Sequence, residues 1–314
     1  MQYFSDLASG KIGSPINTVE LDTTLLKDQQ SLYFSEIRSK YAGIFNQHFV
    51  ASIPYILEEQ CRFGSTVINY AEYIRARYGR NNFNIYTLGD GPGVMSRALS
   101  DASNGKIYSL CCSPNTENFH TFNAKKPNKS AYFYLGPFYE VNRKNLAKKG
   151  INDFKDGFDI IVEDTTFQMY GKSRLIPIYL ANRNLRDDGL FIFLEKFSNN
   201  NKEEFIRREK QKDNDFKSRF FLKDQIECKK KSIIQYMDEN LITIQGMGLA
   251  LSNFFCYAVI TWSSGNFATI VASNNLENLK KFVSLMTPPA IPSNYCYFQL
   301  PKILLGHENS IQFR

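Results

Sequence analysis

A short glycine-rich segment, Gly89-Asp90-Gly91-Pro92-Gly93, is the part of the chain whose residue types and spacing indicate chemistry most directly. It follows an apolar run at 85–88 and precedes a helix expected over 94–102. Glycines in such a turn allow tight bends and let a ligand approach the main chain. The helix start adds free N–H groups and a partial positive charge, which suit a carboxylate or a phosphate. The segment therefore predicts a cofactor-binding turn.

The spacing of the glycines narrows the kind of cofactor. A dinucleotide fingerprint needs G-x-G-x-x-G, and the sixth position here is Val94. The spacing G-x-G-x-G is the one used for S-adenosylmethionine, where the loop meets the methionine end. The predicted cofactor-binding residues are Gly89, Asp90, Gly91, Gly93, Cys111, Cys112, Asp164 and Thr165.

Acidic residues that are usual in such sites are missing from this chain. The position two residues before the first glycine is Thr87, the end of the second strand is Cys111, and the place after the third strand is Pro137. A cysteine is only a weak hydrogen-bond partner. Asp90 and Asp164 are candidates to compensate for the missing acids. We do not expect a catalytic cysteine, because no histidine lies nearby in the sequence.

The elements that must position these residues alternate between strand and helix. After an expected helix over 46–79, the strands are predicted at 85–88, 106–112, 131–135, 158–163 and 189–197, with helices at 94–102, 116–125 and 172–186 between them. This order predicts an α/β fold with a mostly parallel sheet and right-handed crossovers. Two β-rich runs over 254–273, joined at Ser263-Ser264-Gly265, predict an antiparallel hairpin that closes the sheet. That closure is the arrangement of class I methyltransferases, a Rossmann-like fold.

The domain organisation follows from these elements. We expect an N-terminal helical extension or lid over 1–45, a core over 46–273 and a C-terminal extension over 274–314. Within the core, the charged stretch 198–250 is expected to be a helical insertion or lid.

Composition limits the classes of protein further. The chain has 314 residues, of which 43% are hydrophobic, which suits one large domain with additions. It has no apolar run long enough for a membrane span, no recognisable secretion signal and no C-x-x-C pair among its six cysteines. We therefore expect a cytoplasmic protein without a metal site. The net charge of +7 is concentrated over 202–231, as either a solvated helical surface or a basic rim over an anionic substrate or RNA.

Several motifs resemble one family when they are taken together. They are HFVASIPYILEEQ, YTLGDGPG, VEDTTFQMY, LFIFLEKF, DFKSRFFLKDQIECKKKSIIQYM and TWSSGNFATIVAS. Their order and spacing over roughly 48–273 resemble carboxy-S-adenosylmethionine synthases and their methyltransferase relatives. The resemblance implies a class I fold that uses S-adenosylmethionine or a carboxylated derivative of it.

The resemblance also implies roles for single residues. Asp164 takes the place of an asparagine after the fourth strand, and Lys230 falls where the synthases have the arginine that binds the extra carboxylate. Because lysine lacks the two-pronged geometry of arginine, a methyltransferase-like relative with altered specificity is favoured over a synthase. Catalytic candidates by placement are Glu195, Asp164 and Tyr170. Candidate substrate-binding residues are Glu195, Arg219, Lys230, Trp262 and Asn266, and Lys217 is a further basic residue of the expected lid.

Four functions remain open from the sequence. The first is an S-adenosylmethionine-dependent methyltransferase, a transferase that acts on a small anionic or aromatic acceptor. A second is an enzyme that makes or uses carboxy-S-adenosylmethionine, and a third is a non-catalytic binding protein on the same fold. A nucleic-acid methyltransferase depends on net charge alone and is the weakest. A homodimer is left open, and no membrane partner is expected.

Overall fold

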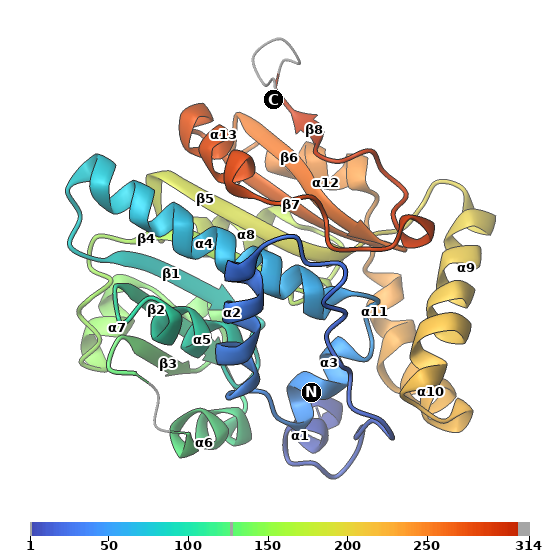
Figure 1. The fold of residues 1–314 in the computed structure, drawn as a ribbon. Coiled ribbons are helices and arrows are strands. Elements are labelled where there is room, and N and C mark those ends of the chain that lie inside the picture. Colours follow the sequence, from blue (N-terminus) through green and yellow to red (C-terminus); the bar gives the residue numbers. More distant parts are fainter. Residues whose placement is uncertain (1, 126–127, 307–314) are drawn as a thin grey trace.

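The alternating apolar runs become the strands of one sheet in a computed structural model, which describes residues 2–125 and 128–306 (Figure 1). In that described part eight strands follow the order β3-β2-β1-β4-β5-β7-β6-β8. Their bounds are β1 Phe83–Leu88, β2 Ile107–Ser113, β3 Ala131–Leu135, β4 Phe158–Asp164, β5 Leu185–Lys196, β6 Tyr257–Ser264, β7 Phe267–Ser273 and β8 Lys302–Leu305. Strands β1 to β5 pair in parallel, and β7 runs antiparallel to both β5 and β6. The predicted fold class is therefore confirmed.

Helices cover both faces of this sheet (Figure 1). Their bounds are α1 Gln2–Ala8, α2 Gln29–Ser39, α3 Ile44–Val50, α4 Ile56–Tyr78, α5 Val94–Ala102, α6 Thr116–Ala124, α7 Arg143–Lys148, α8 Leu175–Asn182, α9 Lys202–Gln211, α10 Lys223–Lys229, α11 Gln235–Glu239, α12 Ile244–Leu251 and α13 Leu276–Leu285. One apolar core joins the sheet to α2, α4, α5 and α13, and a second joins its other face to α7, α8 and α12.

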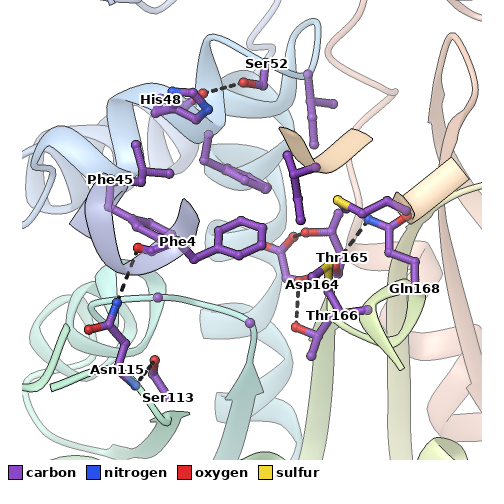
Figure 2. Close-up of a pocket in the computed structure, with 18 of the residues that line it drawn as sticks. Phe4, Phe45, His48, Ser52, Ser113, Asn115, Asp164, Thr165, Thr166 and Gln168 are labelled. Atoms are coloured by element: carbon purple, nitrogen blue, oxygen red, sulfur yellow. Dashed lines mark hydrogen bonds between the residues drawn. The ribbon is translucent and has the colours of Figure 1, made fainter. Parts of the chain in front are cut away.

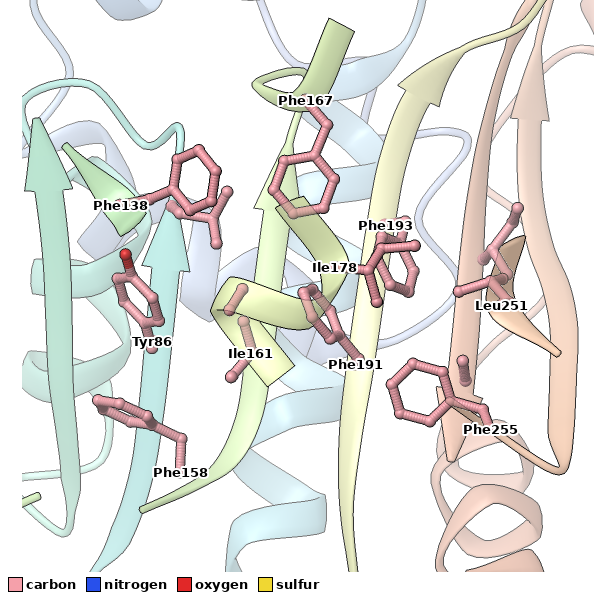
Figure 3. Packing of buried hydrophobic residues seen from close by; sticks show 14 of the residues in the cluster. Tyr86, Phe138, Phe158, Ile161, Phe167, Ile178, Phe191, Phe193, Leu251 and Phe255 are labelled. Carbon is pink, nitrogen blue, oxygen red and sulfur yellow. The ribbon is translucent and has the colours of Figure 1, made fainter. Parts of the chain in front are cut away.

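Neighbouring residues of a strand enter different cores, which explains the continuous apolar runs in the sequence. In β1, Ile85 belongs to the core beneath α4 and α5, whereas Tyr86 belongs to the core beneath α8 and α12. Figure 3 shows the second core, where Phe191 and Phe193 of β5 lie near Ile178 of α8. Their two rings stack with centroids 4.2 Å apart. A strand buried on both faces has no polar side to alternate with.

The predicted hairpin forms between β6 and β7 and turns at Gly265, whose φ is +58°. The expected helix over 46–79 is divided into α3 and α4 by a break in which Tyr55 adopts a φ of 60°. The described part of the expected C-terminal extension joins the core, because α13 packs on the sheet and β8 pairs with β6. Its remaining residues, 307–314, lie outside the described part.

The stretch expected as an insertion or lid contains α9, α10, α11 and α12, with π-helical turns at Lys212–Phe216 and Lys230–Ile234. Each π turn adds a residue to the helical repeat, so side chains beyond it face a different side. In the described residues no helix is both long and apolar enough to cross a membrane.

Candidate functional site

A cavity of about 450 Å³ lies at the carboxyl ends of β1, β2, β4 and β5. It is next to the glycine segment, at the point where the strand order reverses between β1 and β4, the usual place of ligands in open α/β sheets. Figure 2 shows Phe4 of α1 and Phe45 of α3 on one side of it and Asp164, Thr165 and Gln168 on the other. The N-terminal residues therefore form part of the cavity wall.

All three glycines of the segment have positive φ, at 91° for Gly89, 53° for Gly91 and 74° for Gly93. A Cβ atom at Gly89 would overlap the main chain of Asp164, and one at Gly91 would lie 2.5 Å from the Phe45 ring. A Cβ atom at Gly93 would lie 2.6 Å from the Cys111 sulfur. Side chains are therefore excluded at these three positions, and Gly89 and Gly91 line the cavity.

Asp90 does not face the cavity but caps the helix that follows. Its carboxylate accepts hydrogen bonds from the backbone N–H groups of Met95 at 3.1 Å and Ser96 at 2.8 Å. The expectation of free N–H groups at this helix start is thus corrected, because the loop supplies its own anion there. A ligand at the glycines meets backbone and Asp164 rather than an open helix end.

The two cysteines of β2 point in opposite directions, as neighbours in a strand must. Cys111 is fully buried among Phe122, Ala131 and Phe133, and its Sγ lies 3.6 Å from the Tyr132 carbonyl oxygen. It does not line the cavity. Cys112 does, with its Sγ 3.0 Å from the hydroxyl of Tyr86. Burial raises the pKa of the Cys112 thiol to about 12, so it stays protonated.

Asp164 is the predicted residue most directly placed in the cavity. It ends β4, and Thr165 follows with a φ of 51°. The main-chain carbonyl of Asp164 lies against Gly89. Asp164 lines the cavity, and within the described residues its carboxyl forms no ion pair. Burial, and then the charge of Asp90, raise the pKa of Asp164 well above its ordinary value. This carboxyl would be stabilised as an anion by a cation bound beside it.

The preceding residue, Glu163, supports the turn that forms part of the cavity wall. It is fully buried, and its Oε1 accepts hydrogen bonds from the backbone N–H groups of Thr166 and, at 2.9 Å, Phe167. Burial and the nearby Glu195 raise the pKa of Glu163 well above its ordinary value. This carboxyl fixes the turn that carries Asp164 and Gln168.

Glu195, predicted to be both catalytic and substrate-binding, is placed away from the cavity. Its carboxylate lies 2.8 Å from Arg174, and both side chains are 0% exposed. Arg174 also donates to the carbonyl oxygens of Gly171 and Asn240. Because the carboxylate is enclosed by this arginine, Glu195 connects β5 to the surrounding loops and does not reach a ligand.

The other predicted substrate-binding residues also lie outside the cavity lining. Trp262 is completely buried in a third apolar cluster, together with Ile56 and Phe216. Asn266 donates to the Phe205 carbonyl oxygen and to Glu209. Arg219 lies over the rings of Phe216 and Phe220, and Lys230 lines a separate outer groove. Packing or internal hydrogen bonds therefore occupy the first three side chains, whereas Lys230 is exposed.

Tyr170 lies at the rim of the cavity and is 43% exposed. Its ring packs edge-to-face against Phe138 at 5.1 Å. Burial and the neighbouring Tyr139 raise its pKa above the ordinary value, so its hydroxyl remains protonated at neutral pH.

The structure adds lysines that the sequence analysis did not assign to the site, apart from Lys217. Those that line the cavity are Lys196, Lys212, Lys217 and Lys229. The sequence indicated these cavity lysines only weakly, because a charged helical run normally indicates a solvated surface. Lys230 was expected from the family resemblance, whereas in the structure the preceding residue, Lys229, lines the cavity and Lys230 lines an outer groove.

Two further lining residues carry buried atoms without a hydrogen-bond partner in the described structure. The Nδ1 of His48 lies 2.6 Å from the Gly13 carbonyl oxygen, whereas its Nε2 is unpaired. Burial lowers the pKa of His48 to about 3, so the ring is neutral and Nε2 is an acceptor. Gln168 donates to the Thr165 carbonyl oxygen, and its Oε1 is likewise unpaired. Both atoms are available to a donor in the cavity.

Neither a protein-family model nor a curated protein sequence matches the chain. Among solved structures it resembles the plantazolicin methyltransferase BpumL in complex with SAH, at 10% identity and a TM-score of 0.48, over 78% of this chain and 96% of that chain. A putative S-adenosyl-L-methionine-dependent methyltransferase from Methanococcus maripaludis gives 16% identity and a TM-score of 0.38, over 82% and 97% of the two chains. An O-methyltransferase family protein from Burkholderia thailandensis gives 10% identity and a TM-score of 0.40, over 69% of this chain and 59% of that chain. These likenesses concern the arrangement of strands and helices and do not decide cofactor or acceptor.

Proposed function

We propose that this protein is a methyltransferase that uses S-adenosylmethionine and acts on a small molecule. One observation carries the proposal: a glycine turn with three positive φ angles opens into a cavity opposite Asp164, at the carboxyl edge of a sheet closed by an antiparallel hairpin. Gly89 and Gly91 would present main chain to the methionine end of the cofactor.

The charge of the site fits this cofactor, which carries a positive sulfur and a positive amino group. Asp164 lines the cavity without an ion pair in the described residues, and its pKa is raised by burial. A cation beside it would restore the ionised form, with release of a proton on binding. A neutral or purely anionic ligand would leave Asp164 protonated or repelled.

The adenosine end would be held by polar groups after β2, in place of the missing acid. Ser113 lines the cavity there, and its Oγ accepts from the backbone N–H of Asn115 and from the Asn118 amide at 3.0 Å. With two donors already pointing at it, the Ser113 hydroxyl keeps its own hydrogen for a ligand oxygen. This arrangement compensates for a buried Cys111.

When bound, the cofactor supplies a methyl group on a cationic sulfur, and its transfer depends mainly on alignment. The chain excludes water with the apolar side chains of Phe4, Leu7, Phe45 and Phe49, which line the cavity. Among the three predicted catalytic residues, Asp164 lines the cavity and would be ionised beside the bound cation, so that its carboxylate could accept a proton. We assign Asp164 that role and assign Tyr170 to the rim.

Calorimetry with S-adenosylmethionine and S-adenosylhomocysteine tests the proposal. Gly91→Val would place a branched side chain against Phe45 and should weaken binding by more than about tenfold. Gly79→Val is the matched control, because Gly79 also has positive φ, 62°, but has open space around it. Absence of binding to the wild-type protein at millimolar cofactor would instead favour a non-catalytic protein on this fold.

A further inference from the structure

Four lysines gather at one end of the cavity, at the end of β5 and along the helical insertion. Three of them are buried, with side chains 4% exposed for Lys196, 9% for Lys212 and 6% for Lys217. An ammonium group loses its hydration when it is buried, so each one needs an opposite charge or a set of acceptors. The lysine end, as we call these four residues, is therefore not an ordinary solvated surface.

Acidic side chains of the insertion supply partners for three of the lysines. Glu209 lies 2.8 Å from Lys196 and 2.6 Å from Lys212, and Asp213 lies 3.0 Å from Lys217. Asp238 lies 2.6 Å from Lys196.

The fourth, Lys229, differs from the others. Its Nζ donates to the Ser52 hydroxyl at 2.7 Å, and it forms no ion pair among residues 2–125 and 128–306. The lysine end thus has four lysines and three carboxylates as partners, and Lys229 is the one left without a carboxylate.

We propose that the lysine end binds an acidic group, a carboxylate or a phosphate, carried by the methyl acceptor. The assignment to the acceptor depends on the proposed function, because the glycine turn and Asp164 form the other end of the same cavity. Ile233, Ile234 and Met237 line the wall beside the lysines. The acceptor would therefore join an acidic group to an apolar body, as an aromatic or aliphatic acid does.

The surroundings of Lys229 make this binding sensitive to pH. Burial and the ammonium groups of Lys217, Lys212 and Lys196 lower its pKa well below the ordinary value, and Asp213 opposes them only in part. His48 of α3 stays neutral, since its pKa is about 3. An anion would restore the charged form of Lys229, so binding takes up a proton and strengthens as pH falls toward neutrality.

The neighbouring lysine provides a matched control for the test. Lys230→Met removes the same charge from the next residue, which is exposed and lines the outer groove rather than the cavity. Benzoate and phenyl phosphate are the probes, titrated by calorimetry into the protein with and without S-adenosylhomocysteine. The stronger of the two probes identifies the acid as a carboxylate or a phosphate.

We expect Lys229→Met to weaken binding of the stronger probe by about tenfold or more and Lys230→Met to leave it within about twofold. S-Adenosylhomocysteine should bind both variants like the wild type. Equal losses in both variants, or no loss in Lys229→Met, would overturn the proposal.

Two other outcomes separate this proposal from the proposed function. 5′-Methylthioadenosine lacks the amino acid carboxylate of S-adenosylhomocysteine. If Lys229→Met weakens the binding of S-adenosylhomocysteine but not that of 5′-methylthioadenosine, the lysines bind the cofactor. The assignment to an acceptor is then wrong. If neither cofactor analogue binds the wild-type protein but the probes bind through Lys229, the acid site stands and the methyltransferase assignment fails.

Discussion

The two ends of the cavity satisfy buried charge in different ways. We call the end formed by the glycine turn, Glu163 and Asp164 the glycine end; the other is the lysine end. At the glycine end, backbone N–H groups hold carboxylates: those of Met95 and Ser96 hold Asp90, and those of Thr166 and Phe167 hold Glu163. At the lysine end, side-chain carboxylates of the insertion hold ammonium groups. The first arrangement depends on turn geometry, whereas the second depends on pairs of side chains.

The difference shows what kind of ligand pair the cavity suits. Among the described residues, Asp164 at one end and Lys229 at the other form no ion pair. A cation near Asp164 and an anion near Lys229 would complete both ends. A cationic methyl donor and an acidic acceptor are such a pair, and the apolar side chains that line the cavity would strengthen both contacts by lowering the local dielectric.

The largest effect is expected on the free energy of unfolding, when the hydrogen-bond network of Arg174, between the two ends of the cavity, is removed. Arg174 encloses Glu195 and donates to the Asn240 carbonyl oxygen, and the Asn240 amide donates to the Gln168 carbonyl oxygen. Arg174→Met leaves a fully buried carboxylate unpaired and should lower the free energy of unfolding by about 3–5 kcal/mol at neutral pH. Denaturant unfolding measures it. Arg183→Met, which removes an exposed arginine, is the control, and similar losses in both variants would contradict the role given to Arg174.

The glycine end is tested by a change of charge without a change of shape. Asp164→Asn should weaken the binding of S-adenosylmethionine by about tenfold and the binding of S-adenosylhomocysteine much less. Only S-adenosylmethionine has a positive sulfur. Competition calorimetry with the two ligands measures the ratio. Equal weakening of both would mean that Asp164 contacts the amino group that the two ligands share and not the positive sulfur.

Much of the glycine end could be predicted from the sequence because its signals are local. The spacing of Gly89, Gly91 and Gly93 after an apolar strand specifies a turn, and the residue that ends β4 must lie beside it in a parallel sheet. The capping by Asp90 was not predicted, because a capping side chain normally belongs to the N-cap residue, which here is Gly93, and Asp90 lies three residues before it. The burial of Cys111 and the exposure of Cys112 to the cavity depend on which face of β2 the helices cover.

The lysine end could not be predicted because its contacts are not local. Lys229 donates a hydrogen bond to Ser52, which lies 177 positions away in the sequence. Glu195 forms an ion pair with Arg174, which belongs to a different element. Lys229 and Lys230 are neighbours in one charged run, and only the packing of the surrounding elements decides that Lys229 lines the cavity and Lys230 the outer groove.

A smaller effect concerns the pH dependence of the lysine end. Binding of benzoate or phenyl phosphate should take up protons, measured as a difference in calorimetric enthalpy between buffers of unlike ionisation enthalpy. The uptake should vanish in Lys229→Met and persist in Lys230→Met. Uptake that is the same in both variants would place the titrating group elsewhere, with Lys217 the next candidate because its pKa is also lowered by burial.

The smallest expected effect is on stability and has an unusual sign. In the ligand-free protein the folded state lowers the pKa of Lys229, whereas the unfolded chain keeps an ordinary lysine with a pKa near 10.4. The unfolded state then binds more protons at neutral pH, so Lys229 destabilises the fold there, and this effect disappears as pH rises toward about 10.4. Lys229→Met should therefore stabilise the ligand-free protein at pH 7. Thermal unfolding at pH 7 and pH 10 measures this, with a smaller gain at the higher pH. A lysine that only supported the fold through Ser52 would give a loss at both pH values, so the sign of the change distinguishes a binding residue from a structural one.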